Sequence, residues 1–392
     1  NATTLKIFVN SRQPDMSELK KYKLGDLVTF QRGHDLTKSQ MQEGIFPVAG
    51  SNGVIGFHNE YTTKAPSITI GRSGNIGNAY FFDKDFWAHN TTLYIKEFKN
   101  CDPKFIYYLL QTMNFGGHNS GSAVPSLNRN YIHPIEVQAP DLPTQKEIAQ
   151  ILTSLDDKIE LNLQMNQTLE AMAQAIFKEW FVNFNFPGFD GELVDGLPKG
   201  WNRCLIKDFG KIVCGKTPSK AVKEYFGGEY MFIKIPDMHN SVFIIETTDS
   251  LTEEGVNSQS NKTIPPFSIC VSSIATVGLV CINPEPCQTN QQINSIIPKN
   301  KDLRYFLYFL TTSMKDTFLA TASGGTATLN MNTSQFSNIR AFMPSEDVLN
   351  EFDEIVSPIM EKILENEYNI KSLTQTRDTL LPKLMSGQLE IS

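Results

Sequence analysis

The sequence predicts an α+β protein: two tandem mixed α/β globular modules separated by two long helices that form an antiparallel coiled coil. Two observations lead to this prediction. The chain repeats its pattern at an offset of about 200 residues, and each copy of the repeat ends in a long segment with coiled-coil spacing. Tandem copies that pack through equivalent helices are most simply related by a pseudo-twofold axis.

The first long helix is predicted from Pro143 to Phe181. Thr144 precedes Glu147 by three residues, which is the capping-box pattern of a helix start. Apolar residues then follow a 4-3-4-3 spacing, the period of a coiled coil, and two Asn residues interrupt the apolar seam. A single helix cannot bury such a stripe, so a partner helix is required. The seam comprises Ile148, Leu152, Leu155, Ile159, Asn162, Asn166, Leu169, Ala173, Ile176 and Trp180.

The partner helix is predicted within the same chain. Adding 204 to each seam number gives ten positions of which eight are apolar, and Asn162 falls on Asn366. We interpret that match as a register device, because a polar seam residue specifies alignment at some loss of stability. The alternative is two unrelated amphipathic helices. The second seam comprises Phe352, Val356, Ile359, Ile363, Asn366, Ile370, Leu373, Arg377, Leu380 and Leu384.

The globular parts repeat in the same order. Short β-forming stretches alternate with Gly and Asn turns, and strands at 23–32 and 205–214 lead to Gly33 and Gly215. A short buried helix is predicted at 105–113, matched by 305–310, and a last strand at 134–140. The alignment pairs Gly77 with Gly278, Asn90 with Asn290, and Leu127-Asn128 with Leu329-Asn330.

These patterns predict six segments. Residues 1–21 form a lead-in, whose first two residues are expected to be a cloning remnant because no start Met precedes them. The remaining segments are a first globular module at 22–140, a first long helix at 141–182, a linker at 183–200, a second globular module at 201–345, and a second long helix with a C-terminal tail at 346–392.

Charge is distributed unevenly along the chain. The whole chain has a net charge of −7, yet residues 1–140 carry 14 basic and 11 acidic residues (14 − 11 = +3) and residues 183–345 carry 14 of each. The acidic excess lies in the two helical segments. The net charge therefore does not exclude basic faces on the globular modules.

Several functional classes find no support. The six Cys residues have irregular spacing without a C-x-x-C pair, and the six His residues are scattered, so we expect reduced thiols and no metal site. There is no signal-peptide pattern and no apolar run near 18 residues, so a cytoplasmic protein without a membrane span is expected. No methyltransferase or nuclease motif is found, so we expect a chain without catalysis of its own.

One motif resembles an enzyme site. The stretch from Gly210 to Thr217 satisfies G-x-x-x-x-G-K-T, the phosphate-binding loop of P-loop NTPases. Such a loop must open a helix, but Pro218 follows at once and the first copy has Gly33-His34-Asp35 at the equivalent turn. We favour a strand-to-turn junction and keep a P-loop NTPase as an alternative, with Lys216 and Thr217 as possible contacts to a DNA phosphate.

Polar residues in the turns match the chemistry of base edges. Arg and Lys pair with guanine, Asn and Gln with adenine, and Ser and Thr with either. Gly/Ser/Asn stretches also form ordinary turns, but these sets recur at matching places in both copies, which favours nucleic-acid binding. In the first copy they are Arg72, Ser73, Asn75, His89, Asn90, Thr91, Ser120, Ser122, Asn128, Arg129 and Asn130. In the second they are Lys216, Thr217, Ser272, Ser273, Asn290, Gln291, Gln292, Ser323, Thr326 and Asn330.

At this point the sequence resembles the DNA specificity (S) subunits of type I restriction–modification systems. The resemblance covers nearly the whole chain from Tyr22. It rests on LPTQKEIAQILTSLDDKIELN (142–162), LEAMAQAIFKEWF (169–181), RDTLLPKLMSGQLEI (377–391) and, in part, GKTPSK (215–220).

The resemblance implies a non-catalytic subunit of a restriction and DNA methylation complex. Each globular module would be a target recognition domain that reads half of a split site on double-stranded DNA. The helices would set the spacing and bind two methyltransferase (M) subunits, and the complex would recruit restriction (R) subunits. S-adenosylmethionine, ATP and Mg²⁺ would belong to those partners. Because the two modules differ in sequence, we predict an asymmetric site. A protein-interaction scaffold that does not bind DNA is the remaining alternative.

Overall fold

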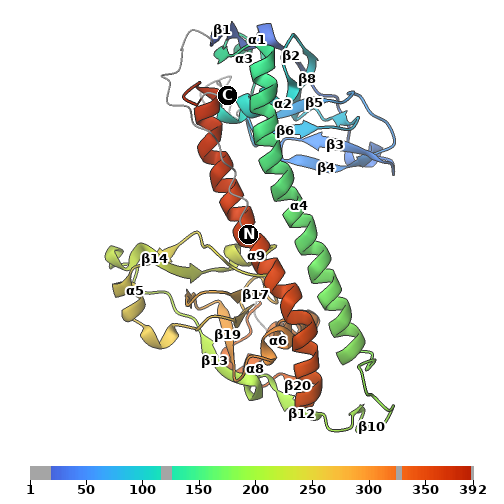
Figure 1. Ribbon diagram of the computed structural model, residues 1–392, viewed down its shortest axis with the longest axis vertical. Helices are drawn as coiled ribbons and strands as arrows, with labels where there is room; N and C mark the ends of the chain where they lie inside the picture. The colour runs from blue at the N-terminus through green and yellow to red at the C-terminus, as the bar shows by residue number, and fades with distance from the viewer. Residues whose placement is uncertain (1–18, 116–125, 324–328, 390–392) are drawn as a thin grey trace. The chain divides into compact units, whose positions relative to one another are not determined.

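The computed structural model describes residues 19–115, 126–323 and 329–389 (Figure 1). The chain forms two compact units. Unit 1 contains residues 1–160 and 372–392, and unit 2 contains residues 161–371. The predicted lead-in lies largely outside the described residues, and β1 begins within its last two residues, at Lys20. Ser120, Ser122 and Thr326 also lie outside the described residues.

Unit 1 is built from short strands, a few short helices, and parts of the two long helices. The first long helix, α4, covers Leu142–Phe181 and the second, α9, covers Glu346–Met385. Each of them contributes to both units. The other elements of unit 1 are β1 (Lys20–Lys23), α1 (Leu24–Leu27), β2 (Val28–Arg32), η1 (Lys38–Gln40), β3 (Phe46–Gly50), β4 (Gly53–His58), β5 (Ser67–Gly71), β6 (Ala79–Phe82), β7 (Trp87–Ala88), β8 (Thr92–Phe98), α2 (Pro103–Thr112), α3 (Arg129–Ile132) and β9 (Glu136–Ala139).

The elements of unit 2 follow the same order, with several short ones added. They are β10 (Leu193–Val194), β11 (Leu197–Pro198), β12 (Asn202–Leu205), η3 (Ile206–Phe209), β13 (Gly210–Cys214), η4 (Lys223–Tyr225), β14 (Phe226–Ile233), η5 (Ile235–Met238), β15 (Ser250–Leu251), α5 (Glu253–Asn257), η6 (Ser260–Lys262), β16 (Ser268–Ser272), β17 (Val280–Asn283), β18 (Gln288–Thr289), β19 (Ile293–Pro298), α6 (Leu303–Ser313), α7 (Lys315–Ala322), α8 (Thr333–Ser337) and β20 (Arg340–Met343).

The sheets of the two units have the same topology, which confirms the predicted internal repeat. The order β2-β8-β5-β6 in unit 1 corresponds to β13-β19-β16-β17 in unit 2, and both sheets are antiparallel. The order β4-β3-β7 corresponds to β15-β14-β18, with the parallel pair β3·β7 matched by β14·β18. The pair β1·β9 corresponds to β12·β20.

The predicted strands at 23–32 and 205–214 are wrong in one respect, because each is broken by a helical turn. In unit 1 the backbone N–H of Lys23 donates to Asp26 Oδ2 at 2.9 Å, and in unit 2 that of Leu205 donates to Asp208 Oδ2 at 2.7 Å. An Asp side chain that satisfies a free N–H competes with strand pairing and starts a turn. Asp26 and Asp208 thus occupy equivalent positions, and each divides the predicted strand of its copy into two.

The start of α4 also differs from the prediction. The helix begins at Leu142, and the Asp141 side chain accepts a hydrogen bond from the backbone N–H of Thr144 at 3.1 Å. Asp141 therefore caps the helix in place of Thr144. The hydrogen bonds from Thr144 lower the pKa of Asp141, because they stabilise the ionised carboxylate.

In unit 1 the two long helices contribute to one core. Ile148 and Leu152 of α4 and Leu384 of α9 are buried with α2 and the sheet. At the margin of that core, Asp156 accepts hydrogen bonds from Arg377 Nη1 at 2.8 Å and from the Tyr108 hydroxyl at 2.6 Å. Arg377, the charged position of the predicted second seam, thus links α9 to α4 and, through Asp156, to α2.

In unit 2 the helices run antiparallel through an aromatic core. The Phe352 ring of α9 lies 4.9 Å from that of Phe181 and 5.9 Å from that of Trp180, between centroids. Further along, Asn366 Nδ2 donates to Asn166 Oδ1 at 2.8 Å. From the Phe181–Phe352 pair to the Asn166–Asn366 pair, the residue number falls along α4 and rises along α9. This order confirms that the two helices run antiparallel. The predicted seam residues Ile148, Leu152, Leu155, Phe352, Val356, Ile363 and Asn366 are buried, and Ile159, Asn162, Leu169, Ile176, Ile359, Leu373 and Leu380 are half-buried.

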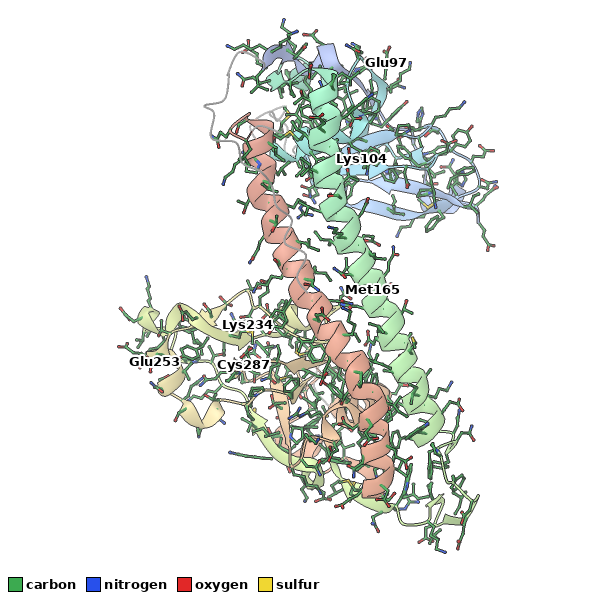
Figure 2. The ribbon with its side chains drawn as sticks, in the orientation of Figure 1. Glu97, Lys104, Met165, Lys234, Glu253 and Cys287 are labelled. Carbon is green, nitrogen blue, oxygen red and sulfur yellow. The ribbon has the colours of Figure 1, made fainter. Side chains whose placement is uncertain are left out.

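Asn366 in the seam does not contact the residue to which the sequence alignment matches it. Asn366 contacts Asn166 and not Asn162, because helices that run antiparallel bring together residues whose numbers have a constant sum, whereas the alignment matches residues at a constant difference. Asn166 is 7% exposed and Asn366 is fully buried. Met165, labelled on α4 in Figure 2, marks this level of the helix.

Glu367 completes this polar group and predicts a pH dependence of stability. It accepts a hydrogen bond from Asn166 Nδ2 at 3.0 Å. Burial raises the pKa of Glu367, and the hydrogen bond from Asn166 opposes this with a smaller effect. The native state therefore keeps this proton to a higher pH than the unfolded chain does. The ionised carboxylate costs stability above the folded pKa, and that cost disappears as the pH falls through it.

We expect Glu367→Gln to be at least as stable as the parent at pH 7.5, since the amide oxygen still accepts from Asn166. The advantage should shrink as the pH is lowered through the folded pKa of Glu367, measured by denaturant unfolding between pH 4 and 8. Glu365→Gln is the matched control, because Glu365 is exposed and pairs with Lys362 at 2.9 Å. A parent protein more stable than Glu367→Gln at pH 7.5 would contradict this account.

The predicted linker is attached to unit 2 by aromatic contacts. Phe186 of the linker stacks on Trp201 at 5.3 Å between ring centroids. Trp201 in turn stacks on Phe342 of β20 at 5.5 Å. The short hairpin β10–β11 lies within the same segment. Among the described residues, no helix combines the length and the apolar character needed to cross a membrane.

Candidate nucleic-acid interface

One edge of the four-stranded sheet in unit 1 gathers most of the DNA-binding residues that were predicted in the first copy. The strands β2 and β5 end there, at Arg32 and Gly71, and β6 and β8 begin there. Glu97, labelled in Figure 2, lies near the other end of β8. The loops that leave this edge, at 33–37, 72–78, 89–91 and 126–130, are called the N-terminal loop edge.

Backbone hydrogen bonds tie these loops together. The N–H of Arg72 donates to Thr91 O at 2.8 Å, and the N–H of Leu127 donates to Arg72 O at 2.8 Å. A bridge between Ser73 and Ser126 joins the same two segments. Residues separated by more than 50 positions in the sequence are therefore neighbours, and the loops are held by the sheet and by one another.

Some predicted side chains also hold these loops together through hydrogen bonds to their neighbours. Both ring nitrogens of His89 are engaged, with Nδ1 2.9 Å from Thr91 Oγ1 and Nε2 3.1 Å from Leu36 O. Asn90 donates to the Asp35 carboxylate through Nδ2. Arg72 Nη1 donates to Asn90 O at 3.3 Å. These contacts set the position of Arg72.

The arginine hollow is an open, polar depression of about 750 Å³ beside this loop edge. Its lining joins Arg72 to Asn128, Arg129 and Asn130, which are exposed, and to Arg32. Gln31 also lines it. The sequence reasoning missed Gln31 and Arg32, although they stand directly before Gly33, the counterpart of Gly215, whose neighbours Lys216 and Thr217 were selected.

His133, at the C-terminal end of α3, attaches this helix and its Arg129 to strand β2. Its Nε2 accepts a hydrogen bond from the backbone N–H of Phe30 at 3.0 Å, so this nitrogen carries no proton. Burial, followed by the positive charges of Lys99 and Arg129, lowers the pKa of His133. A neutral His133 therefore links α3 to β2, the strand that ends at Arg32.

The C-terminal loop edge in unit 2 is built in the same way. It comprises the loops at 215–217, 273–279, 290–292 and 329–334. The N–H of Ser273 donates to Gln292 O at 2.7 Å, and that of Met331 donates to Ser273 O at 2.8 Å. The N–H of Lys216 donates to Thr289 O at 2.9 Å, as that of His34 donates to Ala88 O at 2.7 Å. The two edges therefore share their backbone connections.

These hydrogen bonds correct two of the predicted equivalences. Ser273 corresponds to Arg72, so Asn90 corresponds to Gln291 and not to Asn290. Leu127-Asn128 corresponds to Met331-Asn332 and not to Leu329-Asn330, because Asn128 and Asn332 both cap the short helix that follows, accepting from Asn130 N and Gln335 N. Loop lengths differ between the copies, so a fixed offset fails there. Gly77 and Gly278 are equivalent as predicted, with φ of 86° and 87°.

Three predicted residues of the C-terminal edge are buried and already hydrogen-bonded. Ser272 Oγ accepts from Leu279 N at 2.8 Å, Ser273 Oγ accepts from Asn294 Nδ2 at 2.9 Å, and Asn290 Nδ2 donates to Gln292 Oε1 at 3.0 Å. Their relative exposures are 0%, 1% and 7%. They hold the loops, and the surface of this edge is left to other residues.

The remaining predicted residues of this edge reach solvent. Thr217 Oγ1 donates to Gln291 Oε1 at 2.8 Å, which brings the turn after β13 against the turn before β19. Thr217 and Gln292 are half-buried, and Lys216, Gln291 and Asn330 are exposed. Ser323 follows α7, outside these loops, and is exposed as well.

The geometry does not form a P-loop. Residues 210–214 form strand β13, and a Cβ built on Gly210 would lie 1.9 Å from Ile297 O. Residues 215–219 open no helix. A phosphate-binding loop needs free amides at a helix start, and here the N–H groups of Gly215 and Lys216 are bonded to Ile293 O and Thr289 O. Within the described residues, no cluster of three or more His, Cys, Asp or Glu is arranged for a metal ion.

Comparison with known proteins agrees with this architecture. The profile of the family described as "Type I restriction modification DNA specificity domain" matches residues 16–171 and 198–371. The HindI type I restriction enzyme specificity subunit of Haemophilus influenzae is 40% identical over 359 residues, covering 73% of this chain and 77% of that protein. The MjaIX specificity subunit of Methanocaldococcus jannaschii is 27% identical over 315 residues, covering 75% of this chain and 72% of its own length.

Solved structures agree on the fold. A crystal structure of a type I restriction–modification S subunit from M. genitalium aligns with 97% of both chains, with a TM-score of 0.66 and 16% identity. Two matches to the same family profile, one over each module, also account for the internal repeat. On these grounds, the chain belongs to the type I restriction–modification DNA specificity family.

Proposed function

We propose that this chain reads a split, asymmetric site on double-stranded DNA, with one half read at each loop edge. The observation that supports this most strongly is that the same sheet edge collects the predicted polar loops in both units, through matching backbone hydrogen bonds. Base edges are read by the same side-chain types that are exposed there, namely Arg, Asn and Gln. The two edges differ in sequence, so their half-sites should differ.

The chain has no catalytic role in this proposal. Methylation and cleavage belong to two methyltransferase subunits and to restriction subunits, and S-adenosylmethionine, ATP and Mg²⁺ bind to those partners in the cytoplasm. The long helices are the proposed seat of the methyltransferase subunits. Apolar side chains that remain exposed in unit 2 support this, namely Leu161 and Met172 of α4 and Ile355 and Tyr368 of α9.

An exchange of the C-terminal module tests the proposal. Residues 201–345 are replaced by the corresponding segment of another family member, and the chimera is expressed with its methyltransferase subunits. Sequencing of methylated DNA should show one half of the site changed and the other half retained, because each edge reads its half separately. The reciprocal exchange of residues 22–140 is the control and should change the other half.

Two outcomes would contradict the proposal. A methylated sequence that is unchanged in both halves would show that the modules do not carry specificity. Absence of DNA binding by the parent chain together with its methyltransferase subunits would favour a scaffold that does not bind DNA.

A further inference from the structure

We propose that the arginine hollow of unit 1 is a guanine-reading site, and that the C-terminal loop edge has no counterpart of it. This inference rests on the proposed function, because it assigns base chemistry to one of the two loop edges. It commits the N-terminal half-site to a guanine contacted by Arg32, Arg72 or Arg129. Direct contact of an Arg fork with guanine O6 and N7 is the commonest specific contact in the major groove.

The electrostatics of the hollow favour an acceptor-rich ligand. Arg32 is 54% exposed in its side chain and pairs with Asp35 at 3.3 Å, an exposed pair that contributes little and exchanges readily. Within the part of the chain that the structure describes, neither Arg72 nor Arg129 forms an ion pair. Three guanidinium groups thus line one depression, and Asp35 pairs with one of them, Arg32.

Arg72 is held in place before any ligand binds. Its Nη1 donates to Asn90 O, and its backbone is fixed from both sides by Thr91 and Leu127. Asn90 is itself held by Asp35, and the neighbouring His89 by Leu36 O. A donor fork that is already positioned loses less conformational freedom when it binds, which favours reading of a base over a loose contact to phosphate.

The equivalent positions in unit 2 are neutral. Arg72 corresponds to Ser273, and Arg129 to Thr333, which follows the capping Asn332 as Arg129 follows Asn128. Arg32 corresponds to Cys214, because each precedes a glycine, Gly33 or Gly215, whose N–H donates at 3.1 Å to β8 or β19. The two loop edges therefore share a backbone but not this charge.

The first experiment changes each arginine in the full complex of this chain with its methyltransferase subunits. We expect Arg72→Gln and Arg129→Gln each to weaken binding to the cognate DNA by roughly 10- to 100-fold and to relax methylation specificity at one position of the N-terminal half-site. Arg72→Lys keeps the charge but loses the fork, so it should keep most of the salt dependence and still lose the base preference. Lys84→Gln is the control. It removes an equal charge beyond β6, at the opposite edge of the sheet, and should leave the DNA affinity and the methylation specificity unchanged.

The second experiment changes the DNA. Guanines of the N-terminal half-site are replaced one at a time by 7-deazaguanine, which lacks the N7 acceptor and keeps the phosphates. One replacement should weaken binding by the parent, and Arg72→Gln or Arg129→Gln should add no further loss on that DNA. In the C-terminal half-site, no 7-deazaguanine replacement should remove the additional loss of binding that Arg72→Gln or Arg129→Gln causes.

Three results would overturn the inference. One is a uniform loss of affinity with the specificity intact, which would mark the hollow as a phosphate contact only. Another is an N-terminal half-site without guanine, and the third is unchanged DNA binding by Arg32→Gln, Arg72→Gln and Arg129→Gln alike. Failure of the parent complex to bind any DNA would refute the proposed function as well, and is distinguished by the parent control. Arg129 is exposed, so its variant tests the idea even if Arg72→Gln unfolds.

Discussion

Gly33→Ala is expected to abolish reading of the N-terminal half-site while leaving the C-terminal half-site in use. A Cβ built on Gly33 would lie 2.1 Å from His89 O and 2.6 Å from Ala88 O. Backbone atoms cannot give way as a flexible side chain does, so the end of β2 must separate from the turn before β8. That movement displaces Arg32 and the 89–91 loop together. We expect a loss of about 1–3 kcal/mol in stability and more than about 100-fold in DNA affinity.

The internal repeat supplies the matched experiment. Gly215 occupies the same place in unit 2, where a Cβ would lie 2.2 Å from Asn290 O, so Gly215→Ala should damage the C-terminal half-site alone. Gly56→Ala is the neutral control, because the nearest contact of its Cβ is Met41 Sδ at 3.4 Å. The measurements are DNA affinity of the complex and the methylated sequence. Retention of the N-terminal base preference by Gly33→Ala would show that this close approach does not shape the reading edge.

Phe352→Ala is expected to cost about 3–5 kcal/mol of stability in unit 2, the usual range for removing a large buried ring. Phe352 is fully buried, and its ring contacts those of Phe181 and Trp180 from α4. The cavity would lie between the two long helices and the core of this unit. Loss of packing there should loosen α9 from α4 within unit 2.

The tryptophans make this effect measurable. The chain has three, and in a Trp87→Phe background the remaining Trp180 and Trp201 both report on unit 2. Their fluorescence during denaturant unfolding should show a midpoint well below that of the parent. Ile355→Ala on the same helix is the control, since Ile355 is 45% exposed and its truncation should cost no more than about 0.5 kcal/mol. Equal midpoints for the two variants would contradict the role of Phe352.

Much of the architecture could be predicted because it depends on local periodicity. The seam positions from Ile148 to Leu155 and from Phe352 to Ile363 repeat at helical spacing, and burial of such a stripe requires a partner. The repeat of Gly33 as Gly215 and of Gly77 as Gly278 likewise follows from local backbone demands, since each position needs a close approach or a positive φ. Patterns of this kind are visible one segment at a time.

The contacts across the seam could not be predicted in the same way. The sequence matched Asn162 with Asn366, but the antiparallel helices pair Asn166 with Asn366. Residues of equal rank in two copies are not the residues that touch, because equivalence follows from sequence order and contact follows from direction. The buried Ser272 and Ser273 illustrate the same limit, as a Ser in a turn has the same letter whether it faces solvent or a neighbouring strand.

By itself the sequence determined the α+β class, the tandem repeat, the two long helices and the positions of the polar loops, since each depends on the spacing of residues near one another in the chain. Only the tertiary structure decided which polar side chains reach solvent, which helix residues meet, and that Arg32, Arg72 and Arg129 line one hollow. Those outcomes depend on sheet pairing, which in unit 1 joins β2 to β8 across 61 to 70 positions and β5 to β8 across 21 to 25 positions, through backbone hydrogen bonds that carry no signature in the side-chain sequence.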